Sequence, residues 1–250
     1  CSLGGTTPET VAASKKAMEL GAKVIAVTHV ENSPLAKNAH YVIVHGFEKN
    51  YAAKLEKMTN VLNLSVEILN QYEGYEHYSE MQDAFAKIYD LIEKAVSFVV
   101  PSARNFAEEY KDAPVIYVMS SGATQEVAYA FSICLLMEMQ WVNSGSFHDG
   151  EFFHGPFEIV DKDVPFILLM NEGRTRTLDS RALDFLNRFQ AKTTVLDGKD
   201  FGLGSELSSS VVEYFNPMVL TAVLRVYAEQ LAIVRCHPLT QRRYMWKLEY

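Results

Sequence analysis

Residues 131–156 read FSICLLMEMQWVNSGSFHDGEFFHGP, and the rest of the chain can be interpreted outward from this stretch. Its first half predicts a helix that is apolar on nearly every face, with one carboxylate, Glu138, in the LLMEM run. A helix that is apolar all round is usually buried, and an ionised carboxylate seldom stays unpaired there. Two interpretations follow: Glu138 exchanges protons with carbon or oxygen acids, or it is a structural residue bonded to backbone amides or an arginine.

A histidine, His154, follows sixteen positions after Glu138, inside a GEFFHGP turn. Imidazole can donate or accept a proton near neutral pH, but a histidine before Gly-Pro can equally stabilise the turn. Glu151, in the same turn, is interpreted either as a cap of a short helix or as the group that orients His154. No HExxH or paired CxxC pattern accompanies these residues, so the sequence predicts no metal site.

Outside this stretch, short apolar runs alternate with amphipathic segments. The runs predict strands and the segments predict helices, and their alternation is typical of an α/β fold with parallel sheets and right-handed crossovers. The expected strands are 23–30, 41–44, 115–119, 165–170 and 193–196, and the expected helices flanking them are 8–20, 178–191 and 217–235.

The middle of the chain carries only helical patterns. A helix is expected over 51–72 and a second over 80–99, after which Pro101, lacking an amide donor, should restart a short helix. We interpret residues 76–112 as a helical connector between two α/β units. The expected organisation is a first unit at 1–75, the connector at 76–112, a second unit at 113–236 and a C-terminal tail at 237–250.

Two loops have the same layout, each with Ser, Gly and Thr residues before a helix. The first is SLGGTTPE at 2–9 and the second is SSGAT at 120–124. Free amides and hydroxyls at a helix N-terminus favour anions, so both loops are candidates for phosphate binding and suggest an internal duplication. The first loop, beginning at Cys1, has no strand before it, so we expect the N-terminal part of this unit to be missing from the chain.

Composition is that of a globular protein, with 250 residues and 48% hydrophobic residues. The formal net charge of −8 argues against nucleic acid as the main partner. No uninterrupted apolar run approaches the roughly 20 residues that cross a bilayer, and no signal peptide is visible. Three scattered cysteines do not suggest a disulfide framework. These features predict a cytoplasmic protein without a membrane partner.

Taken together, the motifs resemble those of the sugar isomerase (SIS) domain family. They are the two Ser/Gly/Thr loops, LLMEM, the run SGSFHDGEFFHGPFEIV at 144–160 and the RRYMWKLEY ending at 242–250. Within this family the chain is most similar to deglycases that act on phosphorylated Amadori sugars. The resemblance implies two flavodoxin-like SIS units, the N-terminal one incomplete here, and no cofactor.

The resemblance also implies roles for individual residues. Glu138 falls on the family's catalytic glutamate, and His154 falls on a catalytic histidine that reaches the neighbouring subunit's site, which implies a homodimer. Ser2 and Thr7 fall on hydroxyls that hold the sugar phosphate, and Lys247 falls on a tail lysine that closes over substrate. Further candidates for substrate contact or support are Gly4, Ser120, Ser121, Glu151 and Arg243.

The activity that the resemblance implies is cleavage of a 6-phosphorylated fructosamine by water into an aldose 6-phosphate and a free amine. Two alternatives stay open: an isomerase or a glucosamine-6-phosphate synthase-like domain, and a non-catalytic phosphosugar sensor. The synthase branch carries a lysine where this chain has Leu135, which disfavours that reaction, and a serine of its phosphate loop is Gly4 here.

Overall fold

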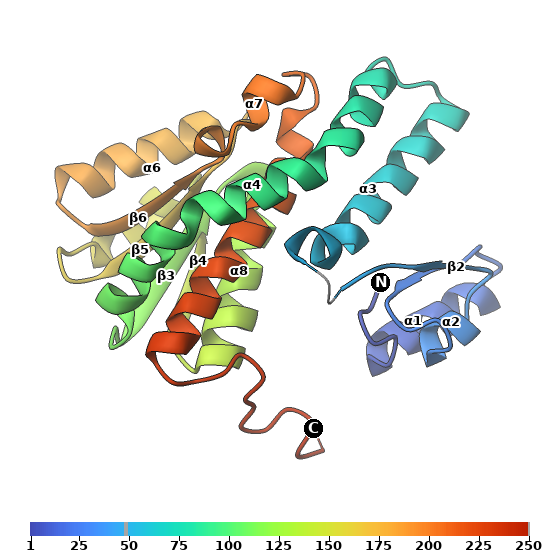
Figure 1. Cartoon of the computed structure of the whole chain (residues 1–250), viewed down its shortest axis with the longest axis horizontal. Helices are drawn as coiled ribbons and strands as arrows, with labels where there is room; N and C mark the ends of the chain where they lie inside the picture. Colours follow the sequence, from blue (N-terminus) through green and yellow to red (C-terminus); the bar gives the residue numbers. More distant parts are fainter. Residues whose placement is uncertain (48–49, 250) are drawn as a thin grey trace. The chain divides into compact units, whose positions relative to one another are not determined.

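The computed structural model describes residues 1–47 and 50–249. The chain divides into two compact units, Cys1–Phe85 (unit 1) and Ala86–Tyr250 (unit 2), and both are α/β (Figure 1). The boundary between the two units falls inside one helix. Residues 237–249, which we expected as a separate tail, belong to unit 2.

Unit 1 is built on a parallel pair of short strands. β1 (Ile25–Thr28) and β2 (Tyr41–Val44) pair in register along their whole length. The helices of this unit are α1 (Pro8–Glu19), α2 (Pro34–Lys37) and α3 (Tyr51–Tyr72). The segment before α1 runs beside β1, because Ser2 N–H donates to the Val27 carbonyl (3.1 Å) and His29 N–H donates to the Leu3 carbonyl (2.9 Å). The Ser/Thr loop therefore lies at the carboxyl end of the sheet.

A single helix, α4 (Tyr78–Tyr110), replaces the two helices expected on either side of Pro101. The expectation of a restart was wrong, because the buried stripe of this helix continues through the proline: Val96 and Val99 before it and Ala103 and Phe106 after it are all buried. Burial of this apolar stripe outweighs the lost backbone hydrogen bond.

Unit 2 contains a four-stranded parallel sheet in the order β4-β3-β5-β6. Its strands are β3 (Val115–Ser120), β4 (Asn143–His148), β5 (Pro165–Met170) and β6 (Lys192–Asp197). Three of them were expected. β4, with the sequence NSGSFH, was not, because it is a polar edge strand whose place is set by its register with β3.

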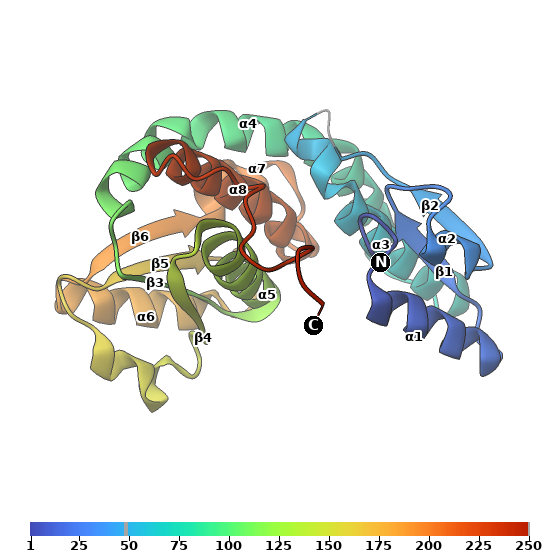
Figure 2. The ribbon, with the colours of Figure 1, turned by 90° about the horizontal axis from the view of Figure 1, so that it is seen from below.

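Helices cover both faces of this sheet (Figure 2). α6 (Arg176–Arg188) lies on one face, where Phe152, Phe166 and Leu186 belong to one buried cluster. α4 and α8 (Asn216–Val234) lie on the other face. The remaining helical segments are η1 (Gly122–Thr124), α5 (Gln125–Ala130), η2 (Phe131–Met139), η3 (Phe152–His154), η4 (Pro156–Ile159), η5 (Gly198–Phe201), α7 (Leu203–Glu206) and η6 (Val212–Tyr214).

The segment Val212–Val234 is long and apolar enough to cross a membrane by length and composition alone. In this structure 61% of its most apolar window is buried, as in a core helix of a globular unit.

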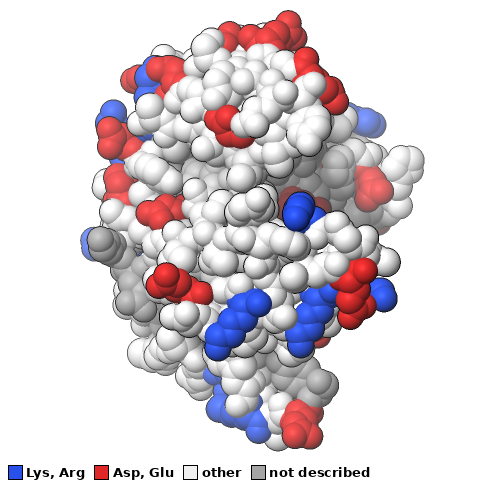
Figure 3. Space-filling view, turned by 90° about the vertical axis from the view of Figure 1, so that its right-hand side faces the viewer, with Lys and Arg blue, Asp and Glu red and all other residues white. Residues whose placement is uncertain are grey.

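The face shown in Figure 3 carries Lys and Arg side chains interspersed with Asp and Glu and with wide uncharged areas.

Candidate active site

Glu138 lies on η2, a π-helical continuation of α5. π-Helical turns widen a helix and occur often at functional sites. The helix ends at Gln140, and Trp141 follows with a left-handed backbone (φ 56°), a conformation that glycine adopts far more easily. Surrounding packing must hold Trp141 in this conformation.

The carboxylate of Glu138 is paired, not isolated. Its Oε1 lies 2.8 Å from a guanidinium nitrogen of Arg242 in the tail, and the exposed fractions of the two side chains are 25% and 7%. The helix is also less buried than expected, since Met137 is exposed and Glu138 is partly exposed. Of the two interpretations from the sequence, bonding to an arginine is observed, while the carboxylate keeps access to solvent.

A pocket of about 390 Å³ opens at this ion pair. Residues 137–138 and 141–143 form one side of it, and tail residues 242–245 form the other. The Arg243 guanidinium stacks 4.4 Å from the Trp141 ring centroid, which places a second cation at the pocket. Lys247 donates to the Arg242 carbonyl (2.6 Å) and does not line this pocket. Tyr250, the last residue of the expected tail, lies outside the described residues.

His154 is the last residue of η3 and is exposed. It does not line the pocket that contains Glu138. The structure therefore does not bring the two expected catalytic residues together within this pocket.

Glu151 occupies the position before η3 but makes no capping hydrogen bond through its side chain. Its carbonyl accepts from the His154 amide (2.8 Å), so its observed contact with His154 is through the backbone. The expected side-chain cap is not formed.

The first Ser/Thr loop brings two expected phosphate ligands together. The hydroxyls of Ser2 and Thr7 lie 2.9 Å apart. Thr7 directly precedes α1, but its side chain makes no hydrogen bond that caps this helix. Gly5 has a left-handed backbone (φ 63°), and a Cβ there would lie 2.1 Å from Ser33 Oγ. Gly4 has no such constraint, since its nearest neighbour would be Thr6 Oγ1 at 3.5 Å.

In the second loop, Ser120 and Ser121 are fully buried. Ser120 Oγ lies 2.7 Å from Thr124 Oγ1 and donates to the Leu169 carbonyl (2.9 Å). Ser121 Oγ donates to the Asp179 carboxylate. These hydroxyls bond to groups of their own unit, so of the two roles considered for them, support is the one that these contacts favour.

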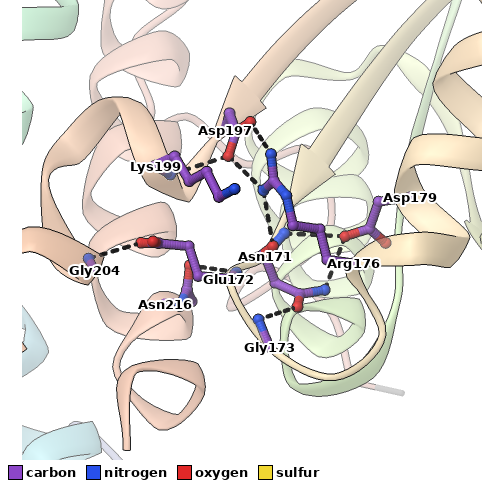
Figure 4. Close-up of polar contacts among 9 residues, drawn as sticks. All are labelled: Asn171, Glu172, Gly173, Arg176, Asp179, Asp197, Lys199, Gly204 and Asn216. Atoms are coloured by element: carbon purple, nitrogen blue, oxygen red, sulfur yellow. Dashed lines mark hydrogen bonds and ion pairs between the residues drawn. The ribbon is translucent and has the colours of Figure 1, made fainter. Parts of the chain in front are cut away.

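A polar network that was not predicted from the sequence lies at the carboxyl ends of β5 and β6 (Figure 4). Asp179 accepts from the amide and side chain of Asn171 (3.0 and 2.8 Å). Arg176 donates to both carboxylate oxygens of Asp197 (2.7 and 2.5 Å). Polar residues directly after apolar strands, at Asn171 and Asp197, were the available signal, because such residues gather at one edge of a parallel sheet.

No group of three or more His, Cys, Asp or Glu side chains that could hold a metal occurs within residues 1–47 and 50–249. Among the described residues, three sets of groups could take part in chemistry. They are the Glu138 carboxylate in a pocket with Arg242 and Arg243, the exposed His154 imidazole, and the hydroxyls of Ser2 and Thr7.

Comparison with known proteins identifies the family. The sequence profile of the SIS domain matches residues 1–71. Fructosamine deglycase FrlB of Bacillus subtilis (strain 168) is 42% identical over 257 residues, covering 100% of this chain and 76% of the relative. This chain belongs to the SIS domain family.

More distant relatives of this SIS protein agree. Fructoselysine 6-phosphate deglycase of Escherichia coli (strain K12) is 23% identical, covering 96% of the chain and 68% of the relative. A crystal structure from Salmonella typhimurium LT2, provisionally named a phosphosugar isomerase, has a TM-score of 0.93 and 43% identity over 98% of this chain and 76% of that one. The C-terminal domain of glucosamine-fructose-6-phosphate aminotransferase from Francisella tularensis shares the fold (TM-score 0.80, 15% identity, 96% of this chain and 71% of that one).

Proposed function

We propose that this SIS protein cleaves a 6-phosphorylated fructosamine with water, releasing glucose 6-phosphate and a free amine. The observation that carries the proposal is the 42% identity, over the full length of the chain, to a protein named as a fructosamine deglycase. The pocket at Glu138 offers a place for the chemistry.

The reaction needs a group that removes a proton from C1 of the sugar and returns one to C2. A fructosamine is a 1-amino-2-ketose, and its C–N bond resists hydrolysis. Removal of a C1 proton gives an enaminol, and return of a proton to C2 gives an imine at C1. Water adds to the imine, which collapses to the aldose and the amine. One carboxylate can make both proton transfers, and Glu138 is our candidate.

Arg242 contributes to this role by fixing the direction of its partner, Glu138. A guanidinium 2.8 Å from Glu138 Oε1 holds that oxygen in one direction and leaves the second carboxylate oxygen to face the substrate. Because this guanidinium is on the tail, the tail positions the base and also forms one side of the pocket.

The remaining roles complete the proposal. Ser2 and Thr7, whose hydroxyls adjoin at the N-terminus of α1, hold the sugar phosphate. His154 moves the proton that opens the sugar ring, and its exposed position outside the Glu138 pocket is compatible with service to a neighbouring subunit in a homodimer. Lys247 closes over bound substrate after leaving its contact with the Arg242 carbonyl. We further propose that the two units are two SIS domains and that the protein is cytoplasmic.

The test is release of amine and glucose 6-phosphate from fructoselysine 6-phosphate by wild type, Glu138→Gln and the matched control Glu126→Gln, an exposed glutamate on α5. We expect Glu138→Gln to lose at least about 100-fold in kcat while still binding phosphosugar, and Glu126→Gln to match wild type. Tight phosphosugar binding without amine release from any fructosamine 6-phosphate would overturn the proposal and favour a sensor.

A further inference from the structure

The turn that carries His154 begins with a buried carboxyl group. Asp149 is 2% exposed, and no N–H or hydroxyl group within residues 1–47 and 50–249 donates to either of its carboxyl oxygens. Its amide donates to the Ser120 carbonyl (2.8 Å), so its backbone is fixed to the end of β3. A carboxylate without donors is strongly disfavoured in the interior, and the group is therefore expected to be neutral.

A second buried carboxyl group, Asp179 on α6, interacts with Asp149. Asp179 is fully buried, but unlike Asp149 it is well supplied with donors. Ser121 Oγ donates to it, and so do both nitrogens of Asn171 (Figure 4). Burial raises the pKa of Asp179 above its ordinary value, and these hydrogen bonds oppose that rise. A protonated Asp149 can donate a hydrogen bond to this carboxylate, which gives the Asp149 hydroxyl an acceptor.

The charged and titratable groups around the pair are few. Arg176 on α6 attracts Asp179 but is bonded to Asp197 at the end of β6. His148, next to Asp149 in the chain, uses its Nδ1 to accept from the Gly150 amide (3.0 Å). Burial, followed by the hydrogen bond and charge of Asp179, raises the pKa of Asp149 to about 9.

A short turn, packed against α6, connects Asp149 to His154. The Phe152 amide donates to the Asp149 carbonyl (3.4 Å), and the Phe152 ring is fully buried in the same cluster as Ala182 and Leu186 of α6. Phe153 carries the Arg181 guanidinium over its ring at 4.1 Å. Apolar packing thus holds the turn against α6, and Asp149 is the first residue of this turn.

We propose that Asp149 is a positioning residue: as a neutral acid it donates its proton to the Asp179 carboxylate and so holds the turn that places His154. Loss of this proton puts two carboxylates side by side in the interior, which repel each other and loosen the turn. The effect on catalysis rests on the proposed function of His154, whereas the proton shared between the two acids does not.

The first experiment needs no activity. Carboxyl ¹³C and imidazole ¹⁵N resonances are followed from pH 6 to 10 in wild type, Asp149→Asn and Asp163→Asn. Asp163 is a matched surface control, 80% exposed. We expect one carboxyl group to titrate near pH 9 in wild type and in the control but not in Asp149→Asn, and the His154 resonances to shift with the same midpoint. A titrating Asp149 with an unresponsive His154 would overturn positioning, and no carboxyl titration near pH 9 would overturn the shared proton.

The second experiment measures kcat and KM for amine release over the same pH range. The asparagine amide can donate as the protonated acid does but cannot ionise, so Asp149→Asn should keep its kcat above pH 9, where wild type and Asp163→Asn lose theirs. Asp149→Ala, which has no donor, should lose at least tenfold in kcat at pH 7 with little change in KM. Equal alkaline losses in wild type and Asp149→Asn, or full kcat in Asp149→Ala, contradict the proposal. If wild type releases no amine at all, the proposed function fails, and the resonances still decide the role of Asp149.

Discussion

The two Ser/Gly/Thr loops have one layout and opposite environments. In unit 1, the hydroxyls of Ser2 and Thr7 bond to each other, and Thr7 is exposed. In unit 2, Ser120, Ser121 and Thr124 are fully buried and bonded to their own unit. A loop of this composition can therefore present hydroxyls to a ligand or use them to join strands. If the loops descend from a duplication, one copy has kept free donors and the other has become part of the core.

The largest expected difference between the loops is in pH dependence, because the buried acids among the described residues, Asp149 and Asp179, lie beside the second loop. With a pKa of about 9, folded Asp149 retains a proton that the unfolded chain loses near pH 3.8. The folded state binds more protons over this interval, so the free energy of unfolding should fall as pH rises from about 4 to 9. Asp149→Asn should remove this fall, a relative gain on the order of 7 kcal/mol at pH 9.

Urea unfolding followed by tryptophan fluorescence measures this, since Trp141 and Trp246 both belong to unit 2. Wild type and Asp149→Asn should converge at pH 4 and separate as pH rises. Curves that stay parallel would show that Asp149 is ionised in the folded protein.

The two loops share one feature: each contains a glycine, Gly5 or Gly122, that a neighbouring side chain approaches closely. Gly5→Ala forces a Cβ against Ser33 at a left-handed backbone position and should destabilise by about 3 kcal/mol. Gly122→Ala (φ 57°, with Thr175 Oγ1 at 2.4 Å) should cost about 2 kcal/mol. Gly4→Ala is the matched control, with an expected change below about 0.5 kcal/mol. Thermal unfolding that ranks Gly4→Ala with Gly5→Ala would contradict this account.

Ser121→Ala separates a structural hydroxyl from a ligand-binding one. It removes a donor from the buried Asp179 carboxylate and should destabilise by about 2 kcal/mol. Phosphosugar affinity, measured by calorimetry, should not change. A fall in affinity with unaltered stability would mean that the second loop binds ligand after all.

Thr7→Ala is expected to show the reverse pattern and the smallest effect. The lost hydroxyl should weaken phosphosugar binding by about 1 kcal/mol, roughly fivefold in Kd, with little change in the melting temperature because Thr7 is exposed and caps nothing through its side chain. Thr6→Ala, its exposed neighbour, is the control. Unchanged affinity in Thr7→Ala would remove Thr7 from the phosphate site.

Local pattern predicted those elements whose own residues define them. β5 (PFILLM) is buried at every position, and β2 and α3 lie where the apolar runs and helical spacing placed them. Pattern failed at β4, whose polar residues carry no strand signal, and at Pro101, where burial on both sides keeps α4 continuous. In each case the deciding interaction came from another element.

The same division holds at the candidate site. The residue pattern drew attention to Glu138 and His154 but left structural roles open for both, and the resemblance to the SIS family supplied their catalytic roles. Their surroundings could not be predicted: Arg242 reaches Glu138 from 104 positions away and Asp179 reaches Ser121 from 58. The sequence by itself determined the parallel α/β elements, the two Ser/Thr loops and the candidate base. The tertiary structure decided which hydroxyls are free and which acids are paired, because hydrogen bonds and burial join residues that are distant in the chain.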